Sequence, residues 1–255
     1  MRNFIMNINK EELEIFSRQL ILDEFNFQDF KKLQNRNVSI IGIGGIGCPT
    51  AQYLISSGIK NLQIFDQDVI KKNNLNRQTL FSINDIGKKK SIIAKKKLKG
   101  INPLAKIKSY HKKISEDNLD LLKESSIVID ATDNWETMKL VNNYCQSNSI
   151  PLLSSSVVGF DIQIALFANN KKNHLCLECV FPNNNYMELA RCETVGILGT
   201  AAGLAGLISA QKTINFLMQF NQNNNFLTLI NCKSLSFNHI KIDKNPKCNL
   251  ILSKK

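Results

Sequence analysis

The chain of 255 residues is 43% hydrophobic and carries a formal charge of +12. This length can bury one substantial core, so we expect a single domain. The charge suits an anionic partner, but lysine is used heavily throughout, and 7% aromatic residues leave little for base stacking; composition therefore indicates no nucleic-acid-binding class.

Cysteine usage and hydropathy indicate a cytoplasmic protein. Seven cysteines, an odd number, and an amino terminus without a sustained apolar core predict a reduced protein with no secretory leader. The longest apolar run, residues 195–210, is shorter than the roughly 20 residues that span a bilayer. We expect it to form a buried helix, and no membrane partner.

The predicted elements alternate between helix and strand after a polar helical arm at residues 9–35. Apolar runs predict strands at 38–43, 62–66, 105–110 and 126–132, with helices at 46–57, 88–100, 116–124 and 135–148. Beyond Pro151, residues 152–167 read as two strands with a turn near Gly159, and residues 226–242 as a further hairpin. This pattern predicts an α/β fold: a Rossmann-like, mostly parallel sheet extended by antiparallel strands, with helices on both faces.

A glycine-rich turn follows the first strand in "SIIGIGGIGCPTAQYL", residues 39–54. Gly42, Gly44 and Gly47 fit G-x-G-x-x-G, and Asp66 ends the next strand. Such glycines bring the backbone close to a phosphate at a helix amino terminus, and the acid can accept a hydrogen bond from a ribose hydroxyl. The turn predicts an adenine nucleotide, with a nicotinamide or flavin dehydrogenase as the default class.

Donors beyond the second strand favour a triphosphate instead. Asn74, Arg77 and Gln78 follow that strand, and Lys90 begins a predicted helix. Breaking a triphosphate builds negative charge that fixed cations stabilise. For any single lysine of this chain, a solvated surface position is the explanation we favour.

Two carboxylates follow the fourth strand in "DATDN". Asp130 and Asp133 reach the carboxyl edge of the sheet, where ligands bind in open α/β folds. Asp130 is as easily a strand-end turn residue. Asp133 is the better Mg²⁺ ligand, because Asn134 can cap the next helix beside it.

Eight segments together resemble the ThiF/MoeB/HesA family, bacterial relatives of ubiquitin-activating enzymes that adenylate the terminal glycine of a ubiquitin-like sulfur carrier. They are "FSRQL", "GIGGIGCPTAQYL", "NNLNRQTLF", "DIGKKKS", "INP", "IDATDN", "CLEC" and "RCETVGILG". The resemblance runs roughly from Ile15 to Cys248. It implies an arm at 1–35, a nucleotide-binding half at 36–150 and a carrier-binding half at 151–255.

The resemblance also implies roles for individual residues and identifies ATP with Mg²⁺ as the ligand. Asp66 would bind the ribose, Asp133 would hold Mg²⁺, and Arg18 would reach the ATP of the partner subunit in a homodimer. The nucleotide loop would be Gly42, Gly44, Gly45 and Gly47, and the phosphate contacts Asn74, Arg77 and Lys90, beside Gln78 and Asn134.

The resemblance also implies roles for several cysteines. Cys192 corresponds to a cysteine that in some members joins the activated carrier or accepts sulfur from a sulfurtransferase; a loop thiol without chemistry is the alternative. Cys176, Cys179 and Cys248 match three ligands of the family's structural zinc site, while Ile251 stands where the fourth is expected. His174, His239, Cys232 or water could complete the tetrahedron. Without that ligand, zinc binding stays an open question.

The identity of the carrier rests on short segments. "SSVVGF", "CVFPNNN" and "RCETVGILG" resemble the thiamine branch, which activates ThiS, whereas "NPKC" resembles the molybdopterin branch, which activates MoaD. We favour ThiS. The alternatives are MoaD, the tRNA-modifying relatives, an NAD-dependent oxidoreductase, and a non-catalytic binder of a ubiquitin-like protein.

Overall fold

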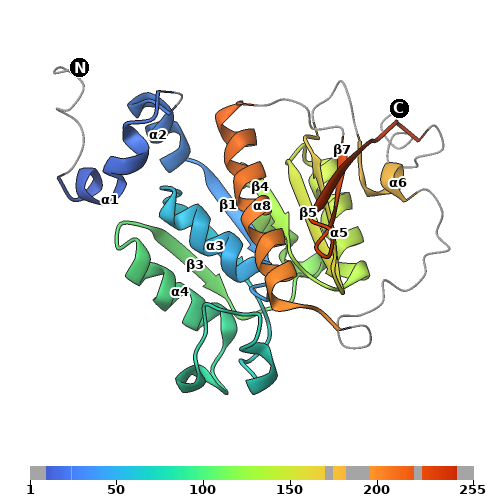
Figure 1. Cartoon of the computed structure of the whole chain (residues 1–255), viewed down its shortest axis with the longest axis horizontal. Helices are drawn as coiled ribbons and strands as arrows, with labels where there is room; N and C mark the ends of the chain where they lie inside the picture. The colour runs from blue at the N-terminus through green and yellow to red at the C-terminus, as the bar shows by residue number, and fades with distance from the viewer. Residues whose placement is uncertain (1–9, 24, 170–174, 182–195, 221–225, 246–255) are drawn as a thin grey trace.

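An eight-stranded mixed sheet forms the centre of the computed structural model, which describes residues 10–23, 25–169, 175–181, 196–220 and 226–245 (Figure 1). The strands are β1 (Asn37–Ile41), β2 (Asn61–Phe65), β3 (Lys106–Tyr110), β4 (Ile127–Asp130), β5 (Leu152–Val158), β6 (Asp161–Phe167), β7 (Phe226–Asn231) and β8 (Ser236–Lys241). Their order is β3-β2-β1-β4-β5-β6-β7-β8. Pairings from β3 to β5 are parallel and those from β5 to β8 antiparallel. The predicted fold class is confirmed.

Helices cover both faces of the sheet, as predicted. On one face lie α3 (Gly47–Ser56), α4 (Lys90–Ile101) and α8 (Gly199–Met218); on the other lie the 3₁₀-helix η4 (Glu116–Leu122), α5 (Trp135–Ser147) and the short α6 (Leu177–Val180) (Figure 1). Successive strand residues point to opposite faces, so Ile40 packs in the core under α3 and Ile41 in the core under α5.

The helix predicted at 116–124 is present as the 3₁₀-helix η4. Leu119 and Leu122, three residues apart, are both buried, which matches the three-residue turn of a 3₁₀-helix. The Asn118 side chain accepts a hydrogen bond from the Ser115 backbone N–H at 3.2 Å and fixes the start.

The amino-terminal arm consists of two helices, α1 (Lys10–Leu20) and α2 (Phe27–Gln34), which dock through a buried carboxylate. Glu12 accepts hydrogen bonds from Lys31 and Gln34, both at 2.9 Å, and from Lys60. Burial alone would raise the pKa of Glu12, but these hydrogen bonds outweigh it and lower the pKa to about 2. The arm is thereby fixed beside Lys60, just before β2.

The apolar run at 195–210 contributes most of α8, which packs on α3, β5 and β6. Contact is closest at Gly206, where an added Cβ would lie 2.4 Å from Pro49 Cγ and 2.5 Å from the Ile46 carbonyl oxygen. None of the helices described, α8 included, has the length and apolar character to cross a membrane.

Candidate functional site

The glycine turn lies between β1 and α3, at the carboxyl edge of the parallel strands. Gly42 has a φ of +87°, and a Cβ there would stand 2.8 Å from the Ala131 carbonyl oxygen. A Cβ on Gly47 would stand 2.0 Å from the Gly42 carbonyl oxygen. Both positions therefore require glycine. The turn packs against Ala131, just after β4, and the backbone N–H groups that follow it belong to the first turn of α3.

Asp66 follows β2 and is fixed to this turn. Its Oδ2 accepts a hydrogen bond from the Ile43 N–H at 2.9 Å, and its Oδ1 accepts one from the Asp68 N–H at 2.8 Å. Burial raises the pKa of Asp66, and the positive charge of Lys90 opposes that rise. Each carboxylate oxygen has a second lone pair for a ligand hydroxyl.

Lys90 begins α4 and is almost fully buried, with a relative side-chain exposure of 7%. Its Nζ lies 2.8 Å from Oδ2 of Asp68, whose side chain is 58% exposed. The sequence analysis missed Asp68 as this partner; the "DQD" after β2 was the available signal. A buried ammonium held by an exposed carboxylate can exchange that partner for a phosphate.

Arg77 and Gln78 lie over the glycine turn. A Cβ on Gly45 would stand 3.3 Å from Arg77 Cγ, and one on Gly44 would stand 3.7 Å from Gln78 Nε2. Arg77 Nη1 donates to the Asn73 carbonyl oxygen at 3.0 Å. The Oε1 atom of Gln78 is buried without a hydrogen-bond partner among the described residues, so the site presents an unused acceptor as well as a fixed guanidinium.

Asn74 serves the backbone in this structure. Its Oδ1 accepts a hydrogen bond from the Lys71 N–H at 3.0 Å, which closes the short 3₁₀-helix η2 (Lys72–Asn74), and the residue is buried. A phosphate contact from Asn74 stays a prediction.

Asp130 is a fully buried carboxylate at the end of β4. Its Oδ1 accepts hydrogen bonds from the Thr132 hydroxyl at 2.7 Å and backbone N–H at 3.1 Å, while Oδ2 has no partner within the described residues. Burial raises the pKa of Asp130 to about 6, against the lowering effect of Thr132. It is a strand-end residue that holds the β4–α5 turn.

Asp133 is exposed in the same turn. Asn134 caps α5, since its Oδ1 accepts a hydrogen bond from the Thr137 N–H at 2.8 Å. Thr132 Cγ2 would lie 3.3 Å from a Cβ on Gly42, which places this turn against the glycine turn. An exposed carboxylate beside this glycine turn fits a Mg²⁺ ligand, although the role of Asp133 stays a prediction.

Arg18 lies at the opposite end of the sheet, on the last turn of α1 (Figure 1). The adjacent Gln19 donates to the carbonyl oxygen of Ser57 at the far end of α3. The ten residues of α3 separate the two ends by about 15 Å. The structure therefore does not bring Arg18 to the site of its own chain.

The cysteines divide into a close pair and dispersed residues. The Sγ atoms of Cys176 and Cys179 lie 3.9 Å apart; two thiolates on one tetrahedral zinc, with Zn–S of about 2.3 Å, would lie about 3.8 Å apart. In the described part of the chain, no three His, Cys, Asp or Glu residues form a metal-binding group, so His239 and Cys232 do not join this pair. Cys192, Cys248, His174 and Ile251 lie outside the described residues.

The other cysteines behave as small packing residues. Burial raises the pKa of the Cys48 and Cys145 thiols, which keeps them protonated and inert. Cys232 is half-buried.

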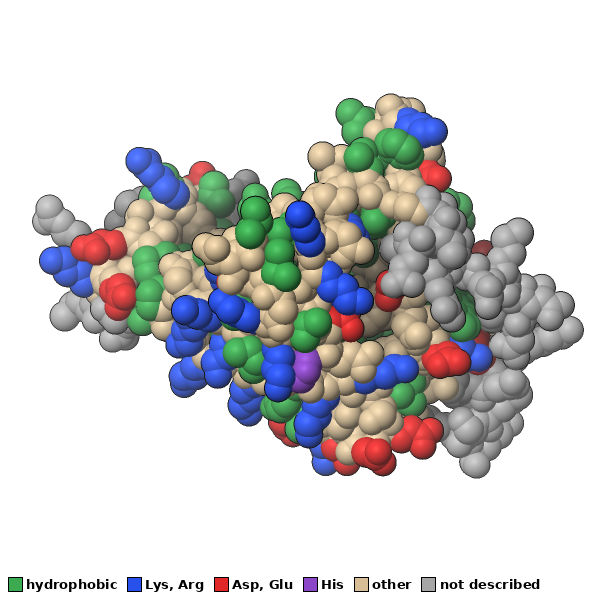
Figure 2. All heavy atoms as spheres, turned by 90° about the horizontal axis from the view of Figure 1, so that it is seen from below, with side chains coloured by type: hydrophobic (Ala, Val, Ile, Leu, Met, Phe, Trp, Pro, Cys, Tyr) green, Lys and Arg blue, Asp and Glu red, His purple; other side chains and the backbone are tan. Residues whose placement is uncertain are grey.

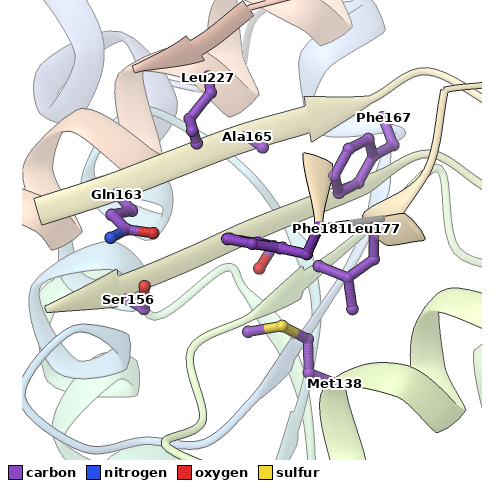
Figure 3. A pocket seen from close by; sticks show the side chains of 9 residues that line it. Met138, Ser156, Gln163, Ala165, Phe167, Leu177, Phe181 and Leu227 are labelled. Atoms are coloured by element: carbon purple, nitrogen blue, oxygen red, sulfur yellow. The ribbon is translucent and has the colours of Figure 1, made fainter. Parts of the chain in front are cut away.

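A small apolar depression, with a volume of about 20 Å³, lies on the α5 side of the sheet (Figure 3). Its lining residues come from β5, β6, β7, α5 and α6: Met138, Ser154, Ser156, Gln163, Ala165, Phe167, Leu177, Phe181 and Leu227. Ser154 is the register partner of Asp130, so the depression begins beside the nucleotide edge. We did not predict this depression from the sequence. Ser154, Ser156 and Gln163, small or polar residues at alternate strand positions, form the pattern that could have indicated it.

The donor set of this edge fits a nucleotide with a phosphate chain. A glycine turn opens a helix, Asp66 lies beside it, and Arg77 and Lys90 add positive charge. A dinucleotide cofactor has no evident use for both cations, whereas a reacting triphosphate has.

Comparisons with known proteins agree with this assignment. A family model described as the ThiF family matches residues 16–250. The sulfur carrier protein adenylyltransferase of Thermus thermophilus is 29% identical over 95% of this chain and 92% of its own. The sulfur carrier protein ThiS adenylyltransferase of Escherichia coli K12 is 30% identical over 94% and 96%.

Longer relatives also match. The adenylyltransferase and sulfurtransferase MOCS3 of Culex quinquefasciatus is 34% identical over 85% of this chain, which spans 50% of that protein. Among solved structures, E. coli MccB with AMPCPP and MccA superposes with a TM-score of 0.81 at 23% identity, covering 96% of this chain and 75% of MccB. The MccB likeness supports the fold, and the family match covers nearly the whole sequence: the chain belongs to the ThiF family.

Proposed function

We propose that this protein is an adenylyltransferase that uses ATP to activate the carboxyl-terminal glycine of a ubiquitin-like sulfur carrier. The observation that carries the proposal is the placement of Arg77 over the glycine turn, with the buried Lys90 beside Asp66. The names of the Thermus and E. coli relatives, which match almost end to end, support this activity.

The proposed reaction is an in-line displacement at the α-phosphorus of ATP. A carboxylate oxygen of the terminal glycine forms a bond to that phosphorus, and the bond to the bridging oxygen of the β-phosphate breaks, which releases pyrophosphate. The carrier carboxylate is already ionised at neutral pH, so no general base is required. Arg77 and Lys90 stabilise the negative charge that develops, and Asp66 orients the ribose. Mg²⁺ held by Asp133 would neutralise phosphate charge.

The depression at β5–β7 is where we place the tail of the carrier. It starts beside Asp130 and lies within the half assigned to carrier binding. Its apolar walls from Phe167, Leu177 and Phe181 suit an extended peptide, and Ser156 and Gln163 supply hydrogen-bonding groups on its floor (Figure 3).

ThiS is the carrier we favour, and MoaD is the second candidate. The E. coli relative named for ThiS matches over nearly its full length, whereas the MOCS3 relatives, which support the MoaD alternative, are about twice as long as the matched region. We also place the enzyme in the cytoplasm as a homodimer, in which Arg18 of one chain serves the other. In the same proposal, Cys192 would join the activated carrier or accept sulfur from a sulfurtransferase.

Exchange of labelled pyrophosphate into ATP tests the activity. With Mg²⁺ present, we expect exchange only when one carrier with an intact terminal Gly-Gly is added, and none with the same carrier truncated. Exchange with ThiS alone supports the thiamine branch. Exchange with MoaD alone supports the molybdopterin branch. Folded protein that supports exchange with neither carrier would contradict the proposal.

A further inference from the structure

The positive charge of the chain is concentrated in one stretch. Residues 88–113 contain eleven lysines and no Asp or Glu. Of the 33 Lys and Arg residues in the chain, 22 remain elsewhere, where they stand against 21 Asp and Glu. The net charge is therefore not spread evenly along the chain, because without this stretch the chain is close to neutral.

Eight of these lysines are exposed on α4, on the edge strand β3 and in the turns beside them, and we call this group the lysine face. The eight are Lys88, Lys89, Lys95, Lys96, Lys106, Lys108, Lys112 and Lys113. Within the described structure none of the eight forms a salt bridge, whereas Lys90 and Lys97 pair with Asp68 and Asp85. Figure 2 shows Lys and Arg side chains gathered over α4 and β3 with few acidic ones among them.

The lysine face is a ridge along the edge of the sheet. β3 is the outermost strand and pairs only with β2. Ile107 packs in the core under α4, so Lys106 and Lys108 lie on the opposite face of the strand. Edge lysines discourage pairing with another chain, but this explains two of the eight residues and none of those on α4.

Collecting these charges destabilises the free protein. Lys95 and Lys99 are four residues apart on α4, and Lys96 and Lys99 three apart, where like charges repel. Lys99 donates to the carbonyl oxygen of Pro103 and Lys88 to that of Asn84, which leaves both charges unneutralised. A polyanion on this surface would relieve the repulsion.

We propose that the lysine face binds the phosphate backbone of a double-stranded nucleic acid. The twelve residues of α4 extend about 18 Å, and a duplex carries about ten phosphates over that length. The stretch contains no arginine, and its one tyrosine, Tyr110, stacks on Phe65. Bidentate base recognition and base stacking are therefore absent from it, which predicts binding without sequence preference. An acidic protein fits less well, because interface cores are poor in lysine.

This binding is separate from the proposed adenylation. β3 and β8 are the two edges of the sheet, about 33 Å apart at normal strand spacing. The proposed carrier half lies toward β8, and Lys90, at the start of α4, belongs to the proposed nucleotide site.

Salt-dependent binding to a short mixed-sequence RNA duplex, and to DNA of the same sequence, tests the proposal. One variant carries Lys95→Gln, Lys96→Gln, Lys106→Gln and Lys108→Gln. The control carries the same charge change at exposed lysines elsewhere: Lys10→Gln, Lys123→Gln, Lys233→Gln and Lys244→Gln. Thermal unfolding confirms that both variants fold.

We expect the wild type and the control to bind with a steep dependence on salt between about 50 and 200 mM. The lysine-face variant should bind at least about tenfold more weakly, with the slope of log K against log salt reduced by about 3 to 4. Tighter binding of RNA than DNA, or the reverse, identifies the natural duplex. Pyrophosphate exchange should be the same in all three proteins.

Three results would overturn the proposal. One is no binding of either duplex at low salt, whether or not vesicles of phosphatidylserine and phosphatidylcholine bind instead. Another is equal weakening in both variants, which would reduce the effect to net charge. The third is loss of carrier-dependent exchange in the lysine-face variant alone, which would assign the face to the carrier.

Discussion

Arg77 lies across Gly45, so that a Cβ on the glycine would come within 3.3 Å of the arginine Cγ. The guanidinium is fixed by hydrogen bonds from Nη1 to the Asn73 carbonyl oxygen at 3.0 Å and the Asn76 Oδ1 at 3.2 Å. Its position over the glycine turn is therefore set before a ligand arrives, as the proposed electrostatic catalysis requires.

Replacing Arg77 by alanine should reduce pyrophosphate exchange by about 10²- to 10³-fold, because a preorganised cation is lost where phosphate charge develops. The midpoint of thermal unfolding should change little. Lys72→Ala is the matched control, since it removes one exposed positive charge from the same segment and should leave exchange intact. Equal losses in the two variants would show that only the overall charge of the segment matters.

Two glycines of α8 should respond oppositely to the same substitution. Gly206→Ala places a methyl group 2.5 Å from the Ile46 carbonyl oxygen, and we expect a loss of about 1–3 kcal/mol in the free energy of unfolding. Gly203→Ala meets nothing within 4 Å and should gain about 0.5–1 kcal/mol through helix propensity. Urea unfolding measures the free energy of unfolding of both variants. Equal changes in this free energy would exclude tight packing at Gly206.

The sequence was most informative where local pattern and tertiary packing agree. The apolar runs at β1 and β4 are buried on both faces, so these strands could be predicted from composition alone. The glycine turn could be predicted because Gly42 and Gly47 have no room for a side chain. The helix at 116–124 was predicted, but its 3₁₀ type was not, because the three-residue spacing of Leu119 and Leu122 occurs in α-helices and 3₁₀-helices alike.

Other features depend on packing that no short segment contains. The depression depends on Phe181, which follows α6, and Leu227 of β7, which line the same hollow although they are far apart in sequence. The position of Arg18 depends on the docking of α1 through Glu12. The lysine face, in contrast, could have been predicted from the sequence. Net charge counted over short segments, rather than over the whole chain, identifies residues 88–113.

Asp130 should make stability fall as pH rises toward neutrality. Burial raises the pKa of Asp130 from 3.8 to about 6, so the folded state holds this proton more tightly than the unfolded chain. Its contribution is fully present below about pH 4 and is lost as pH rises through 6, a change of about 3 kcal/mol.

Asp130→Asn should abolish that component. The variant keeps the acceptor for Thr132 but cannot ionise, so urea unfolding should show a weaker pH dependence between about pH 4 and 7 than in the wild type. Glu12, whose pKa is lowered from 4.5 to about 2, acts with the opposite sign below this window. Parallel curves for the two proteins would mean that Asp130 stays ionised in the folded state.

The spacing of Cys176 and Cys179 predicts that purified protein contains zinc. Two Sγ atoms 3.9 Å apart match two thiolates on a tetrahedral ion, and Cys248 is the third predicted ligand. Metal analysis should find one zinc per chain, lost in both Cys176→Ser and Cys248→Ser. Cys232→Ser should retain it, because Cys232 belongs to no metal-binding group in the described structure. If Cys248→Ser also keeps its zinc, the pair recruits its remaining ligands elsewhere; if the wild type is free of zinc, packing alone holds the carboxyl-terminal strands.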